Sequence, residues 1–187
     1  MVETVRDVMT PRDGQRPHRR RPTTHSEEHS MTFDTTATPI RDVRRDPVAE
    51  QLSRLLAATH ALYQKTLDHW NVTGPDFPSL HQLFEQHYRE LQEATDTVAE
   101  RVRQLGAETP PFGRSMATLT SVPDDDSAPD AMQMPRALID AREAVIATAR
   151  DVVETAEKRS DVATVDIGTQ LIVDHEKAVW TLRSTAS

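Results

Sequence analysis

Two pairs of side chains with metal-ligand chemistry lie between residues 77 and 105. His81 and Glu85 form the first pair, and Asp96 and Glu100 form the second. Residues four apart lie on one face of a helix, so each pair could place two ligands on one cation. The chain has no cysteine, which excludes disulfides, thiolate zinc sites, cysteine-ligated iron–sulfur clusters and thiol nucleophiles. Nitrogen and oxygen ligands suit iron, manganese or zinc.

These two pairs cannot share a metal ion within one chain. Glu85 and Asp96 are 11 residues apart, which is about 16.5 Å along a helix. A second copy, packed antiparallel about a two-fold axis near residue 90 or 91, would bring His81 to Glu100 of the partner subunit and Glu85 to Asp96 of the partner subunit. The spacing therefore predicts two equivalent sites at a dimer interface. The alternative is that all four residues belong to a solvated helix face.

A further imidazole lies upstream of these pairs. His69 stands near the end of the preceding helical segment, about 100° from the apolar stripe of that helix, and Trp70 follows it directly. The His69 imidazole could add a ligand to the intersubunit site. A surface or packing role is the alternative for a single histidine.

Four amphipathic helical segments would position these residues. The expected helices cover residues 47–72, 77–105, 135–159 and 162–183. Only five glycines and 4% aromatic residues also favour helices over a sheet. A segment of about 28 residues that includes several prolines separates the second and third helices. This segment is long enough to cross a bundle and to include a short helix. Two hairpins joined by one long crossover indicate an all-α, ferritin-like four-helix bundle.

Residues 1–46 differ in composition from residues 47–187. The first part carries nine arginines and eight acidic residues, whereas the second carries 13 basic and 22 acidic residues, a net charge of −9. Because residues 1–46 have no sustained apolar period, we expect a disordered tail ahead of the bundle. A solvated arm, or a translation start near Met31, is one interpretation of this tail. Phosphate binding is the other, through a basic cluster formed by Arg16, His18, Arg19, Arg20 and Arg21.

Long apolar runs are absent from the sequence. The longest run has four residues, and the chain begins with charged residues. These features argue against a membrane span and against a secretory signal. We therefore expect a cytoplasmic protein.

The candidate ligands belong to a longer sequence pattern. Residues 68–77 read DHWNVTGPDF, residues 80–85 read LHQLFE, and residues 96–106 read DTVAERVRQLG. These motifs resemble those of the Dps family of ferritin-like miniferritins. The similarity extends over about residues 46–183.

The resemblance implies a hollow dodecamer that binds Fe(II), oxidises it preferentially with hydrogen peroxide, and stores the ferric mineral. It also implies that Trp70 lies beside the oxidation site, where it would intercept oxidising equivalents. Relatives often have aspartate at the position of Glu85, so the longer side chain here alters the expected metal spacing. Each intersubunit site would hold two iron ions between His69, His81 and Glu85 of one chain and Asp96 and Glu100 of its partner.

Two other functions are compatible with the sequence. Many members of the Dps family bind DNA in the nucleoid, and residues 16–21 supply a basic cluster for this role, whereas the acidic residues 47–187 would repel phosphates. The chain could also be a helical interaction module in which the ligand-type residues are inert.

Overall fold

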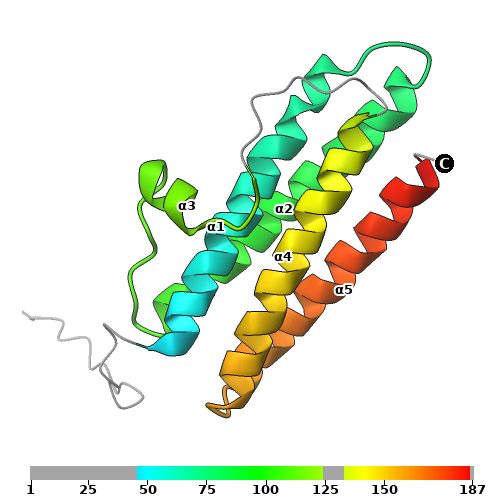
Figure 1. Cartoon of the computed structure of the whole chain (residues 1–187). Helices are drawn as coiled ribbons and strands as arrows, with labels where there is room; N and C mark the ends of the chain where they lie inside the picture. The colour runs from blue at the N-terminus through cyan, green and yellow to red at the C-terminus, as the bar shows by residue number, and fades with distance from the viewer. Residues whose placement is uncertain (1–45, 124–132, 186–187) are drawn as a thin grey trace, which may run out of the picture. The chain divides into compact units, whose positions relative to one another are not determined.

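The computed structural model describes residues 46–123 and 133–185, and these residues form helices and connecting turns without any strand. The long helices are α1 (Pro47–Leu67), α2 (Phe77–Gln104), α4 (Gln133–Glu157) and α5 (Val162–Thr185). A single-turn 3-10 helix, η2 (Asp68–Asn71), follows α1, and a short helix, α3 (Arg114–Leu119), lies in the crossover between α2 and α4 (Figure 1). The expected four-helix bundle with a helix in the crossover is confirmed.

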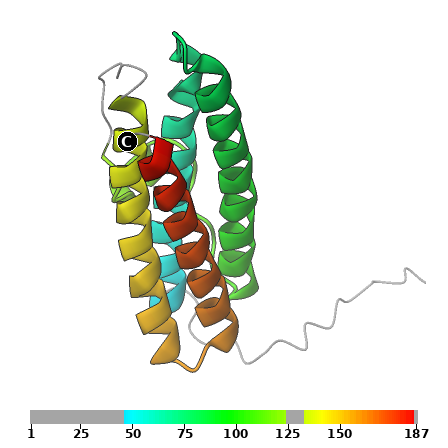
Figure 2. The ribbon, with the colours of Figure 1, turned by 90° about the vertical axis from the view of Figure 1, so that its right-hand side faces the viewer.

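The four long helices pack as two hairpins. α1 packs against both α2 and α4, α4 packs along the length of α5, and α3 lies beside α1. α2 and α5 contact each other only sparingly, and Figure 2 shows α5 closer to α4 than to α2. One side of the bundle, between α2 and α5, is therefore less tightly closed than the others.

Apolar side chains at helical spacing fill the centre of the bundle. Each long helix directs one stripe inward, as the periodicity predicts. Each fully buried leucine or phenylalanine contributes about 1.5–3 kcal/mol relative to exposure. The largest buried side chains are Phe84, Leu52, Leu55, Leu56, Leu62, Leu80, Leu91, Leu138, Leu182, Val48 and Val98.

α4 and α5 approach closely at Gly168. A Cβ atom added to this glycine would lie 2.7 Å from Val153 Cγ2, which is closer than real Cβ contacts. The missing side chain therefore permits the tight packing of this hairpin. Gly168 costs about 0.5–1 kcal/mol in helix propensity relative to alanine, and the close packing offsets that cost.

The first helix ends earlier than the sequence suggests. We expected it to continue to residue 72, but the α-helical hydrogen bonds stop at Leu67, and the chain tightens into η2. A 3-10 turn commonly closes an α-helix, and here the chain must then reverse through Gly74, which has a φ of 98°. Val72 is buried in the core even though it is not helical.

The other helix boundaries agree with the predicted ranges to within two residues. Asp76 occupies the N-cap position of α2, but its side chain makes no capping hydrogen bond. Asp161, in contrast, accepts a hydrogen bond from the Thr164 N–H at 3.1 Å and so caps α5. None of the helices within residues 46–123 and 133–185 combines the length and the apolar character needed to span a membrane.

Candidate metal centre

The four ligand-type side chains of α2 lie on the face of this helix that does not enter the core. The apolar side chains buried by α2 are Leu80, Phe84, Leu91, Val98 and Val102. His81 and Glu85 are half-buried, whereas Asp96 and Glu100 are exposed. The 3.6-residue period separates the two sets, because the ligand positions are rotated by about 100–200° from Leu80. The four residues therefore lie outside the core stripe of α2, as the spacing predicts, and their role as ligands stays a prediction.

His81 and Glu85 lie near the N-terminal end of α2. The Phe77 ring lies over His81, with 5.0 Å between ring centroids and 32° between the ring planes. Glu85 accepts a hydrogen bond from the Arg89 guanidinium, four residues further along the helix. This ion pair is exposed, so it contributes little to stability and leaves Glu85 able to exchange its partner for a metal ion.

η2 places His69 and Trp70 next to the beginning of α2. This short helix contacts both α1 and α2. The Trp70 side chain is 68% exposed, although a large aromatic residue usually has more of its surface covered. The position of the His69 side chain is outside the described part of the structure. The backbone nevertheless brings residue 69 to the same end of the bundle as His81.

The two ligand pairs do not meet within one chain. Along α2 they are separated by 11 residues, about 16.5 Å of helix rise. Within residues 46–123 and 133–185, no three His, Asp or Glu side chains are grouped closely enough to bind a metal ion. One chain therefore carries two separate pairs of ligand-type residues on the outer face of α2.

Comparison with known proteins identifies the family. The ferritin-like domain family matches residues 49–187. A low temperature-induced protein of Nostoc sp. is 39% identical over 152 residues, covering 78% of this chain and 83% of that protein. The DNA protection during starvation protein of Brevibacillus brevis is 31% identical over 140 residues, covering 73% of this chain and 93% of that protein.

A solved structure shows the same fold. The Dps protein from Vibrio cholerae O1, described as a ferritin-like diiron-carboxylate protein, superposes with a TM-score of 0.72 at 28% identity, covering 75% of this chain and 89% of that chain. This chain belongs to the Dps family.

In this Dps-family chain, Arg101 fixes the end of α2 next to Glu100. Its guanidinium donates to Asp161 Oδ1 at 2.6 Å and to Thr164 Oγ1 at 2.8 Å. The Arg101 and Asp161 side chains are only 14% and 16% exposed. Burial opposes ionisation of Asp161, but hydrogen bonds from Thr164 and the charge of Arg101 hold the pKa of this carboxyl below its usual value. The network attaches α2 to α5 and holds Glu100 on the outer face.

Sequence reasoning missed a buried polar cluster of this Dps-family chain. Arg142 of α4 is 3% exposed, and its Nη1 donates to His175 Nδ1 of α5 at 3.1 Å. Burial, and then the Arg142 charge, lower the pKa values of His87 and His175 to about 3. Burial lowers the pKa of Arg142 to about 10, and the nearby Glu90 carboxylate opposes this shift.

His87 and His175 lie on the apolar stripes of α2 and α5, and both are buried. Arg142 is not among the candidate residues predicted from the sequence, although its position in the sequence is unusual for a charged side chain. It lies four residues after Leu138 and three before Val145, so it occupies the apolar stripe of α4, where a charged side chain requires an explanation.

Proposed function

We propose that this chain oxidises Fe(II) at sites shared between two subunits and stores the ferric product. The carrying observation is the placement of two ligand pairs on the free face of α2, too far apart to share a metal ion in one chain. A two-fold axis near residue 90 or 91 completes both sites at once. His69, His81 and Glu85 bind iron from one subunit, and Asp96 and Glu100 bind it from the partner.

The ligand set suits this chemistry. Carboxylates are hard ligands that favour Fe(III) over Fe(II), and imidazole binds both ions. Two Fe(II) ions held together supply two electrons to one hydrogen peroxide molecule, which with two protons yields two water molecules and two Fe(III) ions. Transfer of both electrons at one site prevents release of a hydroxyl radical. We assign to the Trp70 indole, which is exposed, the interception of single oxidising equivalents that escape.

Several further properties belong to the same proposal. The subunits assemble into a closed homo-oligomeric shell, a dodecamer, with two iron ions at each intersubunit site and mineral inside. The protein acts in the cytoplasm in protection against oxidative damage. The net charge of −9 over residues 47–187 supports the proposal, because an acidic body raises the local concentration of cations near its surface.

Iron oxidation by the purified protein tests the proposal. With Fe(II) and a half-equivalent of hydrogen peroxide, the full chain should form ferric species at least about tenfold faster than buffer alone, since each preorganised site removes the need for free ions to meet. The measurement is ferric absorbance in a stopped-flow instrument, with dioxygen as the comparison oxidant. A rate equal to that of buffer would reject iron oxidation as the function.

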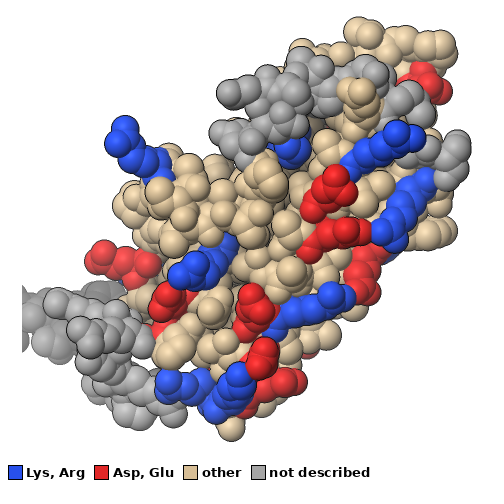
Figure 3. Space-filling view, viewed as in Figure 1, with Lys and Arg blue, Asp and Glu red and all other residues tan. Residues whose placement is uncertain are grey.

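A second candidate function is DNA binding. Its support is the name of the Brevibacillus brevis relative together with the basic cluster at residues 16–21, which lies outside the described residues. On the face shown in Figure 3, acidic and basic side chains are interspersed and form no continuous basic surface. Binding through the tail should therefore weaken steeply with salt and disappear when residues 1–30 are deleted. A gel shift that resists salt, or that survives this deletion, would reject the tail mechanism.

A further inference from the structure

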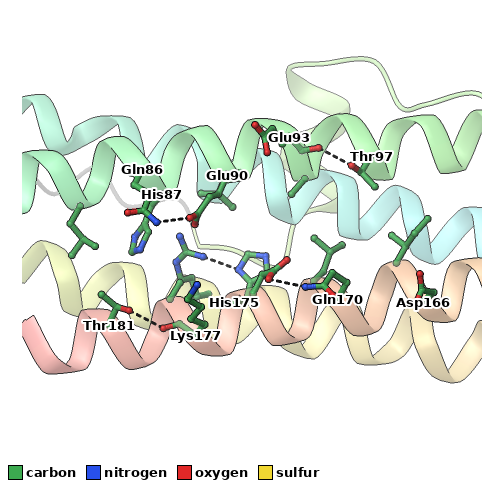
Figure 4. A pocket seen from close by; sticks show the side chains of 18 residues that line it. Gln86, His87, Glu90, Glu93, Thr97, Asp166, Gln170, His175, Lys177 and Thr181 are labelled. Carbon is green, nitrogen blue, oxygen red and sulfur yellow. Dashed lines mark hydrogen bonds between the residues drawn. The ribbon is translucent and has the colours of Figure 1, made fainter.

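A groove of about 550 Å³ lies between α2 and α5, on the less tightly closed side of the bundle. Figure 4 shows His87 and Glu90 of α2 pointing into this space toward His175 and Lys177 of α5. Arg142 of α4 also lines it. The groove lies on another face of α2 from the ligand pairs, rotated from them by about 130°.

Arg142 is a buried cation with unused hydrogen-bond donors. Its Nη1 donates to His175 Nδ1, but its Nε and Nη2 atoms are buried without a hydrogen-bond partner among the described residues. No carboxylate of the described chain lies within ion-pair distance of this guanidinium. An uncompensated buried charge costs several kcal/mol. The site therefore favours a ligand that brings negative charge and hydrogen-bond acceptors.

His87 adds a second unsatisfied nitrogen to the same groove. Its ring is 3% exposed, and Nδ1 has no hydrogen-bond partner within the described part of the chain. A guanidinium presents planar N–H groups that match the oxygens of an oxyanion, and such charge-assisted bonds are among the strongest in proteins. Arg142 and His87 together are suited to a tetrahedral oxyanion.

The rim of the groove is acidic, in contrast to the cationic Arg142. Four carboxylates line it against one lysine, Lys177. With Arg142 and neutral histidines included, the lining has a net negative charge, which repels a bare polyanion. Because an acidic surface attracts cations from solution, mobile cations near the rim would screen this repulsion. The rim carboxylates are Glu90, Glu93, Asp166 and Asp174.

We propose that this groove binds inorganic phosphate at Arg142, while mobile cations screen its acidic rim. In a protein that stores iron, the groove would bring phosphate and oxidised iron together away from the oxidation site. The identity of the physiological cations rests on the proposed function, whereas the phosphate site does not. Phosphate would thus be a component that the protein itself directs into the mineral.

Thermal unfolding of the full-length, iron-free protein tests the phosphate site. Phosphate and chloride buffers are compared at equal pH and ionic strength, with and without Mg²⁺. Phosphate at tenfold excess over its dissociation constant should raise the unfolding midpoint of the wild type by about 3–6 °C, and Mg²⁺ should increase this shift. Arg142→Met should abolish it. The matched control is Arg150→Met, because Arg150 lies on α4 but is exposed and paired with Glu176.

Each outcome has a defined meaning. A wild-type midpoint that is equal in phosphate and chloride overturns the phosphate site, as does an equal shift in wild type and Arg142→Met. If Arg142→Met does not fold, His87→Leu replaces it and should reduce the shift at least threefold. A phosphate shift in a protein that fails to oxidise iron would reject the proposed function and leave the oxyanion site standing.

Discussion

Mixing subunits that carry Glu100→Ala with subunits that carry His81→Ala is expected to restore about one quarter of the wild-type rate of iron oxidation. Each variant alone should lose at least about 10- to 100-fold in rate, because loss of even an outer-shell partner of a metal ligand has effects of this size. Random pairing makes half of the dimers mixed. Each mixed dimer has one intact site and one site that lacks both ligands, so a quarter of all sites recover.

A matched pair of variants distinguishes this geometry from a general effect of refolding. Asp96→Ala and Glu100→Ala alter the same half-site, so every site in a mixture of these two variants retains one defect. Co-refolding of equimolar subunits, followed by the ferric absorbance assay, should show recovery in the first mixture and none in the second. Recovery in both, or in neither, would contradict a site built from two subunits.

Acidification is expected to destabilise the bundle through its two buried histidines. The pKa values of His87 and His175 are lowered to about 3 by burial and by the charge of Arg142, whereas an unfolded histidine titrates near pH 6.5. Between these values the unfolded chain binds protons that the folded chain does not, so stability is full above about pH 6.5 and falls as the pH decreases toward 3. At pH 5 the loss is about 2 kcal/mol for each histidine.

Chemical denaturation at pH 7 and at pH 5, at one protein concentration, measures this loss. His175→Gln keeps an acceptor for Arg142 Nη1 but cannot be protonated in this range, so it should remove about half of the pH dependence. The free energy of unfolding at pH 7 should change much less than the difference between the free energies at pH 7 and pH 5. If His175→Gln leaves the difference in the free energy of unfolding between pH 7 and pH 5 unaltered, other groups cause the acid sensitivity.

Much of the fold follows from local sequence patterns. Apolar residues at 3.6-residue spacing predicted the four long helices, and the long crossover predicted the ferritin-like connection with its short helix, both of which are observed. The predicted end of α1 was wrong, because the chain reversal through Gly74 shortens the helix. Hydrophobic periodicity does not detect such an early helix end. Asp76 occupies the N-cap of α2 without forming a capping hydrogen bond, because residue type alone does not specify which capping hydrogen bonds form.

Of the candidate metal centre, only the position of the four α2 residues outside the core can be compared with the structure. Spacing along one helix paired His81 with Glu85 and Asp96 with Glu100, and none of the four is buried in the core, which agrees with that prediction. The joining of the two pairs into one site stays a prediction, since it depends on a second chain. His69 also stays a prediction, because the described structure locates its backbone and not its side chain.

The sequence by itself determined the helices, the net negative charge of residues 47–187, the absence of cysteine ligands and the division of α2 into two faces. All of these depend on residue type and on the fixed geometry of one helix. Only the tertiary structure showed that Arg142, His87 and His175, from three different helices, meet in one groove. Contacts between helices depend on how closely α2 and α5 approach each other. That distance is set by the packing of the whole core, and it cannot be predicted from the sequence pattern of any single helix.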